Sequence, residues 1–373
     1  MIPVYDAGVT VAGVSVAGLT EQQAGHAVRL ALKTAPQRKV SLRYKDKTYA
    51  RTWKELGVTP DVDAMLRRAW TEADVPLMCT VDMGTAKRSV RRAAMALDVR
   101  PVAPRFTDGP KSAVKPGKPG RKVDVYATAL AVKNRLESTP DADSLPLLVK
   151  PDAPPFTVAD LEAITMPVVR FSTAYNPGDR NRTHNLRLVT QRLNGALIAP
   201  GDTFSFNDWV GERKESDGFR EAIVYKEGKM VKDTGGGLCQ VSSTLYNVAL
   251  LAGLPIVERS RHSLTVNYVP LGRDATIYWG QHDLRFKNDT GMPLYIRAVP
   301  SRGRLTVEAW GSAPLDRKVK VTSSSRRAGG GKTVASVYRT ISENGVESRE
   351  RVSTDTYSTE HTMAPAETRR RRG

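Results

Sequence analysis

The chain has 373 residues, of which 40% are hydrophobic, so it can bury sizeable cores and is not wholly disordered. Its 57 lysine and arginine residues outnumber 39 acidic residues, and the net charge of +18 favours an anionic partner: nucleic acid, a membrane surface or an acidic wall polymer. Two cysteines exclude a disulfide scaffold and a four-thiolate zinc site.

The first part of the chain is predicted to form small α+β elements. Residues 1–19 lack Lys and Arg and alternate Val with small residues, which predicts one or two strands rather than a secretory signal. Thr20 is a helix N-cap candidate, and the helix is expected to end near Leu32. Residues 39–53 predict a hairpin. No apolar run reaches the roughly 18–20 residues of a membrane-spanning helix.

A weak internal repeat divides this region. Asp61 and Asp124 each follow a glycine turn and open an amphipathic helix. This pattern predicts two copies of one small α+β unit, at residues 5–80 and 85–165, unless two capped helices are alike by chance. The basic stretch 111–122, with two Pro-Gly steps, is expected to be a solvated loop.

The remaining chain is expected to form a mixed domain at residues 166–312 and a β-rich extension at 313–373, which ends in a basic tail. The overall class is therefore α+β. The predicted elements are helices at 186–197 and 239–251, strands at 203–207, 265–269, 275–279 and 293–298, and a glycine turn at 329–332.

A glycine loop followed by a cysteine is the candidate reactive site of the sequence. Residues 235–237 are all glycine, so backbone N–H groups can approach a ligand closely. Cys239 would lie in the first turn of the next helix, where the positive end of the helix dipole stabilises a thiolate. The N–H groups from Gly237 to Gln240 are candidates for holding an oxyanion. The alternative is that Cys239 is a small buried packing residue.

A thiolate nucleophile usually needs a nearby base. His262 precedes a predicted strand and is the favoured candidate, whereas His184 opens a predicted helix and His282 lies in a turn. Cys79 is expected to fill a core. The sequence has no phosphate-loop pattern, no recognisable zinc-ligand spacing and no nucleic-acid-binding motif, so no cofactor, metal or nucleic acid is predicted.

At these residues the sequence resembles the VanW family. The resemblance spans about residues 168–298, and its motifs lie at 181–188, 193–207, 218–231, 235–254, 258–277 and 283–288. The preceding region resembles, more weakly, the peptidoglycan-binding repeats found upstream of such domains, at 13–20, 55–64 and 118–129.

The resemblance implies an extracytoplasmic bacterial cell-wall protein, held by a membrane anchor that would lie outside this sequence, and a link to glycopeptide resistance. It also implies an L,D-transpeptidase, with Cys239 as the nucleophile. Many relatives have a second histidine where this chain has Ser260, so His262 is expected to act as the base. The expected partners are peptidoglycan stem peptides and anionic wall polymers, and the protein is expected to be a monomer.

The predicted reaction forms a thioester on Cys239 and then a 3→3 cross-link between stem peptides. Asn267, Asp274 and Asp283 remain equal candidates for the third member of a triad. Residues expected to bind substrate are Ser242, Ser243, Thr244, Arg261, Arg273 and His184. Two alternatives stay open: a non-catalytic peptidoglycan-binding scaffold, and a cysteine amidase or peptidase that uses water as the acceptor.

Overall fold

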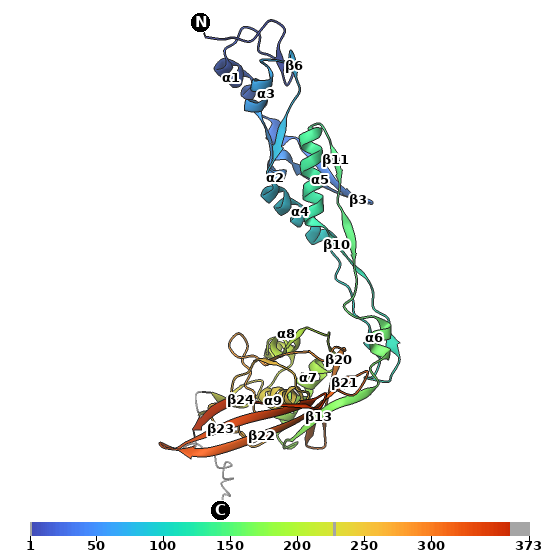
Figure 1. Ribbon diagram of the computed structural model, residues 1–373, viewed down its shortest axis with the longest axis vertical. Helices are drawn as coiled ribbons and strands as arrows, with labels where there is room; N and C mark the ends of the chain where they lie inside the picture. Colours follow the sequence, from blue (N-terminus) through green and yellow to red (C-terminus); the bar gives the residue numbers. More distant parts are fainter. Residues whose placement is uncertain (1, 227–228, 359–373) are drawn as a thin grey trace, which may run out of the picture. The chain divides into compact units, whose positions relative to one another are not determined.

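The computed structural model describes residues 2–226 and 229–358, with side chains described outside 223–232. The chain forms two compact units, one from residues 1–102 and 117–154 and the other from 103–116 and 155–373 (Figure 1). Each unit has its own hydrophobic core or cores. No helix in the described ranges is long and apolar enough to cross a membrane.

The first unit begins with a small core around two short helices. Thr20 caps α1 (Glu21–Ala31) through a capping box with Gln23, as the sequence predicts. Helix α1 packs on α3 (Val62–Arg68), which Asp61 caps. The strands beside them are β1 (Thr10–Val11), β2 (Val14–Ser15) and β6 (Asp74–Val75).

A second core of the first unit joins residues that are far apart in sequence. Leu42 of the predicted hairpin and Leu136 of the Asp124-capped helix share this core, and Cys79 is buried in it as expected. The elements are η1 (Ala35–Gln37), β3 (Lys39–Tyr44), β4 (Lys47–Thr52), α2 (Trp53–Leu56), β5 (Val58–Pro60), β7 (Cys79–Val81), α4 (Met83–Leu97), β10 (Gly120–Val123), α5 (Val125–Ser138), β11 (Ser144–Pro146) and β12 (Val149–Asp152). The boundaries of the two predicted repeats stay a prediction.

The expectation of a continuous loop at 111–122 is wrong. Val114–Lys115 form β9, which pairs with β8 (Arg105–Phe106), and Gly120–Val123 form β10, which pairs with β12. Gly120 lies so close to the backbone of Val99 that a Cβ there would be 2.2 Å from the Val99 carbonyl oxygen. This glycine therefore permits strand pairing as well as a turn.

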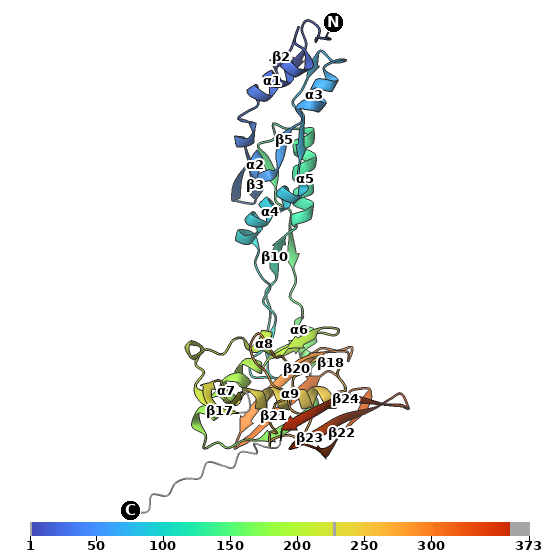
Figure 2. The ribbon, with the colours of Figure 1, turned by 90° about the vertical axis from the view of Figure 1, so that its left-hand side faces the viewer.

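The second unit is built on an antiparallel sheet in the order β13-β21-β20-β14. Helices α7 (Arg180–Leu193) and α9 (Leu238–Leu251) pack on one face of it, around buried aliphatic residues (Figure 2). The strands are β13 (Met166–Ala174), β14 (Ala196–Ile198), β20 (Leu294–Ser301) and β21 (Arg304–Gly311). The packing fixes α9, whose first turn carries Cys239.

Helix α7 differs from its predicted range. The structure starts it at Arg180, because Asp179 accepts a hydrogen bond from the backbone N–H of Arg182 as its N-cap. It ends at Leu193, and the apolar residues that follow Gly195 form β14 instead. Apolar spacing alone does not separate the end of a helix from the start of a strand.

The predicted strands at 265–269 and 275–279 are absent, and the described backbone there makes only isolated bridges. Several backbone groups in and next to this segment bond to side chains instead of to a neighbouring strand. Arg259 Nε donates to the Asp274 carbonyl at 2.6 Å, and the Ala275 N–H donates to Ser243 Oγ at 2.9 Å. The predicted strand at 293–298 is confirmed as part of β20.

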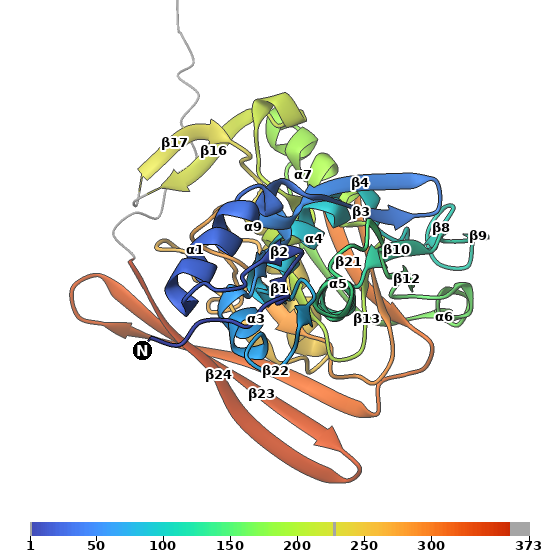
Figure 3. The ribbon, with the colours of Figure 1, turned by 90° about the horizontal axis from the view of Figure 1, so that it is seen from above.

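A three-stranded antiparallel sheet closes the described chain (Figure 3). It consists of β22 (Arg317–Ala328), β23 (Lys332–Glu343) and β24 (Val346–Ser358), which confirms the β-rich C-terminus and the turn at 329–332. The predicted basic tail lies outside the described residues. The sheet packs on the segment around Gly272, where a Cβ would lie 2.6 Å from Val337 Cγ2.

The other elements of the second unit are short. They are α6 (Val158–Glu162), β15 (Thr203–Ser205), α8 (Phe206–Val210), η2 (Glu215–Asp217), β16 (Glu221–Lys226), β17 (Lys229–Thr234), β18 (Ile256–Glu258) and β19 (Arg285–Lys287).

Gly272→Ala should destabilise the second unit by about 2–4 kcal/mol, because φ is +83° and the new methyl group meets Val337. Urea unfolding measures this change. In a Val337→Ala background the penalty should shrink, since the clash is relieved. Gly201→Ala is the matched control: φ is +85° and nothing lies within 4 Å. Equal penalties at the two glycines would show that contact with β23 does not matter.

Candidate active site

The glycine loop places the cysteine at the start of α9. Gly237 is the N-cap, with φ +106°, and a Cβ there would lie 3.1 Å from Arg182 Cγ. Both the backbone conformation and the close approach of Arg182 therefore require glycine. Cys239 is the second residue of the helix, where unpaired N–H groups and the helix dipole favour negative charge.

The Cys239 thiol lies against a histidine. Its Sγ is half-buried, contacts the Ile277 carbonyl oxygen at 3.8 Å and shares a hydrogen bond with the His262 side chain. Burial alone would raise the pKa of the thiol, but the hydrogen bond and charge of His262, with a smaller contribution from Arg213, lower it overall. The site therefore favours a thiolate.

His262 is held by a carboxylate on its other side. The residue is 8% exposed, and its Nδ1 lies 2.7 Å from Asp274 Oδ2. Because Nδ1 faces the carboxylate, Nε2 is the nitrogen left for the thiol. Burial lowers the pKa of the imidazole, but the bonds to Asp274 and Cys239 outweigh it and raise the pKa to about 9. The lowered pKa of Cys239 and the raised pKa of His262 both favour a thiolate–imidazolium ion pair.

Asp274 is the third member that the sequence left open. Burial raises the pKa of its carboxyl group, yet the His262 hydrogen bond and the Arg259 charge lower it to about 2. The other candidates lie elsewhere: Asp283 accepts from Ser205 Oγ at 2.6 Å, and Asn267 is exposed. Cys239, His262 and Asp274 thus form a Cys–His–Asp arrangement.

Tyr357 of the C-terminal sheet and Arg259 together hold the outer oxygen of Asp274. Tyr357 Oη donates to Asp274 Oδ1 at 2.6 Å, and Arg259 Nη2 donates to the same oxygen at 2.9 Å. Arg259 also pairs with Asp355 at 2.5 Å, so its buried charge lies between two carboxylates. This placement stabilises the carboxylate orientation on which His262 depends.

Two of the four predicted backbone N–H donors have no acceptor in the described part of the chain. Leu238 N–H donates to Gly235 at 3.4 Å, and Gln240 N–H donates to Gly237 at 3.1 Å. Within residues 2–226 and 229–358, the N–H groups of Gly237 and Cys239 have no protein acceptor. These two groups are available to an oxyanion formed at the thiol.

Four predicted residues of α9 are buried and bonded within the protein. Gln240 contacts Arg182 and the Ala174 carbonyl, and Thr244 contacts Thr173 of β13. Ser242 and Ser243 both donate to the Cys239 carbonyl, at 3.1 and 2.6 Å. These bonds hold α9 against the sheet and the 275 segment. Substrate contact by Ser242, Ser243 and Thr244 stays a prediction.

The remaining predicted substrate-binding residues are spread out. Arg261 is exposed and donates to the His262 carbonyl at 2.9 Å. Arg273 Nε donates to Asn247 Oδ1 at 2.5 Å, with its guanidinium over Phe171. His184 bonds the Gly218 carbonyl at 2.9 Å, which links α7 to the loop before β16.

Two residues near the thiol were missed by the sequence analysis. Arg213 lies close enough to Cys239 to lower its pKa, and the Arg213 Nε is buried without a partner in the described structure. Burial and the Cys239 charge raise the pKa of Tyr268, whose hydroxyl shares a hydrogen bond with Ser243. Arg213 stands in a run of charged residues that forms no motif, and Tyr268 lies in a segment that the sequence predicts as a strand. Neither residue was therefore identified as part of a site.

Ser260 bonds a different histidine. Its Oγ lies 3.0 Å from His282 Nδ1, at a cavity of about 370 Å³ that His282 lines together with Asn207, Glu258 and Trp279. Asn207 in turn accepts from Arg213 Nη2 at 2.6 Å, which links this cavity to the surroundings of Cys239. Among the described residues, no group of three His, Cys, Asp or Glu is placed to hold a metal ion.

The chain has detectable relatives. Residues 181–310 match the family model "VanW like protein". Similar proteins are the uncharacterized protein YoaR of Bacillus subtilis, 37% identical over 156 residues (42% of this chain, 52% of YoaR), and the vancomycin B-type resistance protein VanW of Enterococcus faecalis, 36% identical over 141 residues (34% of this chain, 51% of that protein). The chain spans about half the length of these curated relatives. No solved structure matches significantly.

Iodoacetamide should alkylate folded protein at Cys239 and spare Cys79, which is buried and whose pKa burial raises to about 11. His262→Gln should slow the labelling of Cys239 at pH 7 by about tenfold or more, because burial then raises the thiol pKa unopposed by imidazolium. Peptide mapping by mass spectrometry measures both sites. His184→Gln is the control. Equal labelling of the two cysteines would contradict the ion pair.

Proposed function

We propose that the chain, which matches the VanW family model over residues 181–310, acts on peptidoglycan in the cell wall, as an acyltransferase with Cys239 as nucleophile. The printed name of the Enterococcus relative, a vancomycin resistance protein, supports a role in the wall or in glycopeptide resistance. The proposed location is outside the cytoplasm. The proposed partners are stem peptides and anionic wall polymers, bound by a monomer.

The observation that carries the proposal is the hydrogen-bonded series from Cys239 through His262 to Asp274. A buried packing cysteine does not need a histidine that a carboxylate orients at 2.7 Å. Nor does a packing role explain a lowered thiol pKa beside free backbone N–H groups. Together these are the nucleophile, the base, the orienting group and the oxyanion donors of acyl transfer.

In the first step, the Cys239 thiolate attacks the carbonyl carbon of the third residue of a donor tetrapeptide. The carbonyl oxygen becomes an oxyanion that the N–H groups of Gly237 and Cys239 stabilise. The tetrahedral intermediate collapses as the amide C–N bond breaks. His262 gives its Nε2 proton to the departing amine, D-alanine leaves, and a thioester joins the third residue to Cys239.

In the second step, a side-chain amine of a neighbouring stem attacks the thioester. Neutral His262 takes a proton from the attacking amine, and the thiolate leaves as the amide bond forms. The product is a 3→3 cross-link, and the ion pair is restored. We expect the Arg213 guanidinium, whose Nε has no partner among the described residues, to bind a carboxylate of the donor.

Two other functions use the same features differently. A cysteine amidase or peptidase would carry out the first step and then transfer the acyl group to water. A non-catalytic wall-binding scaffold would never form a thioester. The lowered pKa and half-buried position of Cys239 favour catalysis over the scaffold.

Intact-mass spectrometry with a disaccharide-tetrapeptide should show a thioester adduct and free D-alanine. Cys239→Ala should form no adduct, whereas the control Cys79→Ala should behave as wild type. Adding a disaccharide-tripeptide with a free side-chain amine should give the cross-linked product. Hydrolysed product alone would indicate the amidase or peptidase. No adduct from wild type, with Cys239 inert to iodoacetamide, would support the scaffold.

The turnover rate should fall as the pH rises through about 9, because His262 then loses the proton that the leaving amine needs. Asp274→Asn should move this alkaline limb toward lower pH, since the raised pKa of His262 depends on the carboxylate. Asp283→Asn is the matched control, because that carboxylate bonds Ser205 instead. Circular dichroism confirms folding. If Asp274→Asn leaves the alkaline limb at the same pH, the assignment of this limb to His262 is contradicted.

A further inference from the structure

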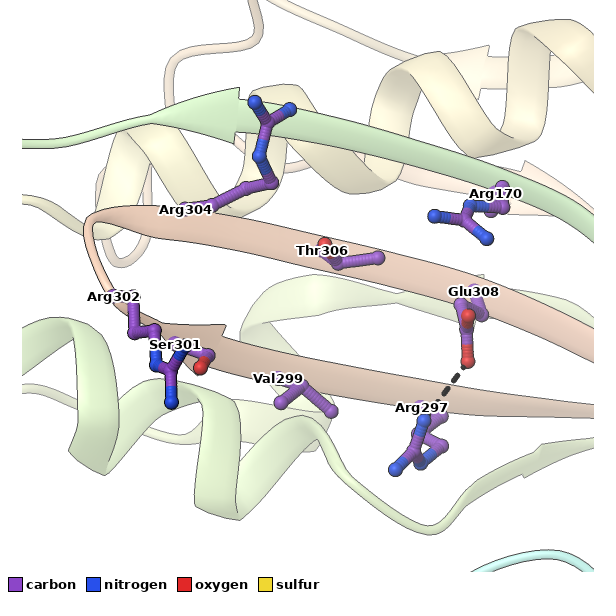
Figure 4. Close-up of a pocket in the computed structure, with 8 residues that line it drawn as sticks. All are labelled: Arg170, Arg297, Val299, Ser301, Arg302, Arg304, Thr306 and Glu308. Carbon is purple, nitrogen blue, oxygen red and sulfur yellow. Dashed lines mark hydrogen bonds and ion pairs between the residues drawn. The ribbon is translucent and has the colours of Figure 1, made fainter.

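The central sheet of the second unit has a second face, which no helix described above covers. Strand residues alternate between faces, so Thr173 and Val307 point toward α9 while Arg170 and Glu308 point away from it. On that outer face lies a cavity of about 430 Å³ (Figure 4). It is lined by Arg170, Arg297, Val299, Ser301, Arg302, Arg304, Thr306 and Glu308, which we call the arginine face.

The charges of the arginine face are unbalanced. Glu308 is its one carboxylate, and it accepts from Arg297 at 3.1 Å and from the Trp310 indole N–H at 2.9 Å. The guanidinium groups of Arg170, Arg302 and Arg304 are exposed and have no acceptor anywhere in the described ranges. Three cations therefore remain for an anion from outside the protein.

The strand register sets how far these cations spread. Arg170 and Arg297 both pair with Glu308, from opposite sides, so two strand spacings of about 5 Å separate their backbones. Arg304 lies four residues from Glu308 along β21, about 14 Å away. This area is much larger than a single phosphate or carboxylate. It matches a chain that carries charges at intervals.

A neighbouring hairpin extends the positive charge. Phe106 of β8 packs edge-on against Tyr295 at 5.3 Å, which fixes the hairpin to the sheet. Lys111, in the turn of this hairpin, lies over the Trp310 ring at 5.8 Å. Its ammonium group adds positive charge next to Trp310, which in turn bonds the cavity residue Glu308.

We propose that the arginine face binds a linear phosphodiester polymer. The paired N–H donors of an arginine guanidinium fit the two free oxygens of a phosphodiester, and Ser301 and Thr306 offer hydroxyl groups on the same face. No aromatic ring lines the cavity, so it lacks the platform on which bases of a single-stranded nucleic acid stack. A polymer of glycerol phosphate or a similar polyol fits this chemistry.

The arginine face and the candidate active site lie on opposite sides of the sheet. Cys239 belongs to α9, which packs on the face that carries Thr173. A polymer on the arginine face would therefore retain the protein near its substrate without covering the thiol. This inference rests on the part of the proposed function that names an anionic wall polymer, and it specifies where that polymer binds. It does not depend on acyl transfer, since no residue of the arginine face contacts Cys239, His262 or Asp274.

Fluorescence anisotropy with labelled poly(glycerol phosphate) tests the proposal on the full chain. A triple variant, Arg170→Gln with Arg302→Gln and Arg304→Gln, should weaken binding by about tenfold or more and should reduce the salt dependence of log Kd by about one for each arginine removed. The matched control changes Lys320, Arg326 and Arg327 to Gln. These residues are exposed on β22, so the net charge is equal but the arginine face is intact.

The outcomes separate the alternatives. Loss of binding in the first variant but not in the control supports the proposal, and Cys239→Ala should bind as wild type whatever its activity. Equal loss in both variants would show attraction by net charge alone and would overturn it. Equal affinity for polyglutamate or for a DNA duplex of matched charge would also overturn the assignment to a phosphodiester polyol. Circular dichroism establishes that each variant is folded.

Discussion

The buried carboxylate of Asp274 is the constraint on which the candidate active site depends. One of its oxygens receives His262, and the other receives Arg259 and Tyr357. Such a carboxylate is costly to bury unless its lone pairs are used, and here partners from two segments, 259–262 and β24, use them. The same bonds hold the imidazole in the orientation that pairs it with Cys239, so the stability of this region and its reactivity rest on one group.

The central sheet gives its two faces different tasks. Side chains that point one way along β13 and β21 hold α9, and with it the thiol at the start of that helix. The side chains that point the other way include the exposed arginines. Because the alternation of a strand separates the two sets by only one residue, the support of α9 and the exposed arginines can be altered independently through neighbouring positions. Part of the net positive charge of the chain is thus concentrated on one face of this sheet.

Much of the local structure could be predicted, because caps and glycines act over a few residues. Thr20, Asp61 and Asp124 start helices where expected, and the glycine loop places Cys239 at the start of α9. Asp274 could not be chosen over Asp283 or Asn267, since spacing along the chain prefers none of them and only tertiary packing distinguishes them. The 265–279 segment was misjudged for a related reason: its backbone bonds to side chains of α9 and Arg259, and such partners leave no periodic signal.

Strand β24, the last strand of the described chain, contributes residues to the surroundings of Asp274. Tyr357 and Asp355 join the Asp274–Arg259 pair from 83 and 96 residues away along the chain. A growing polypeptide therefore holds its cysteine, histidine and aspartate long before the residues that lock them arrive. The surroundings of Asp274 are therefore completed only when the last described strand docks, after synthesis has passed Tyr357.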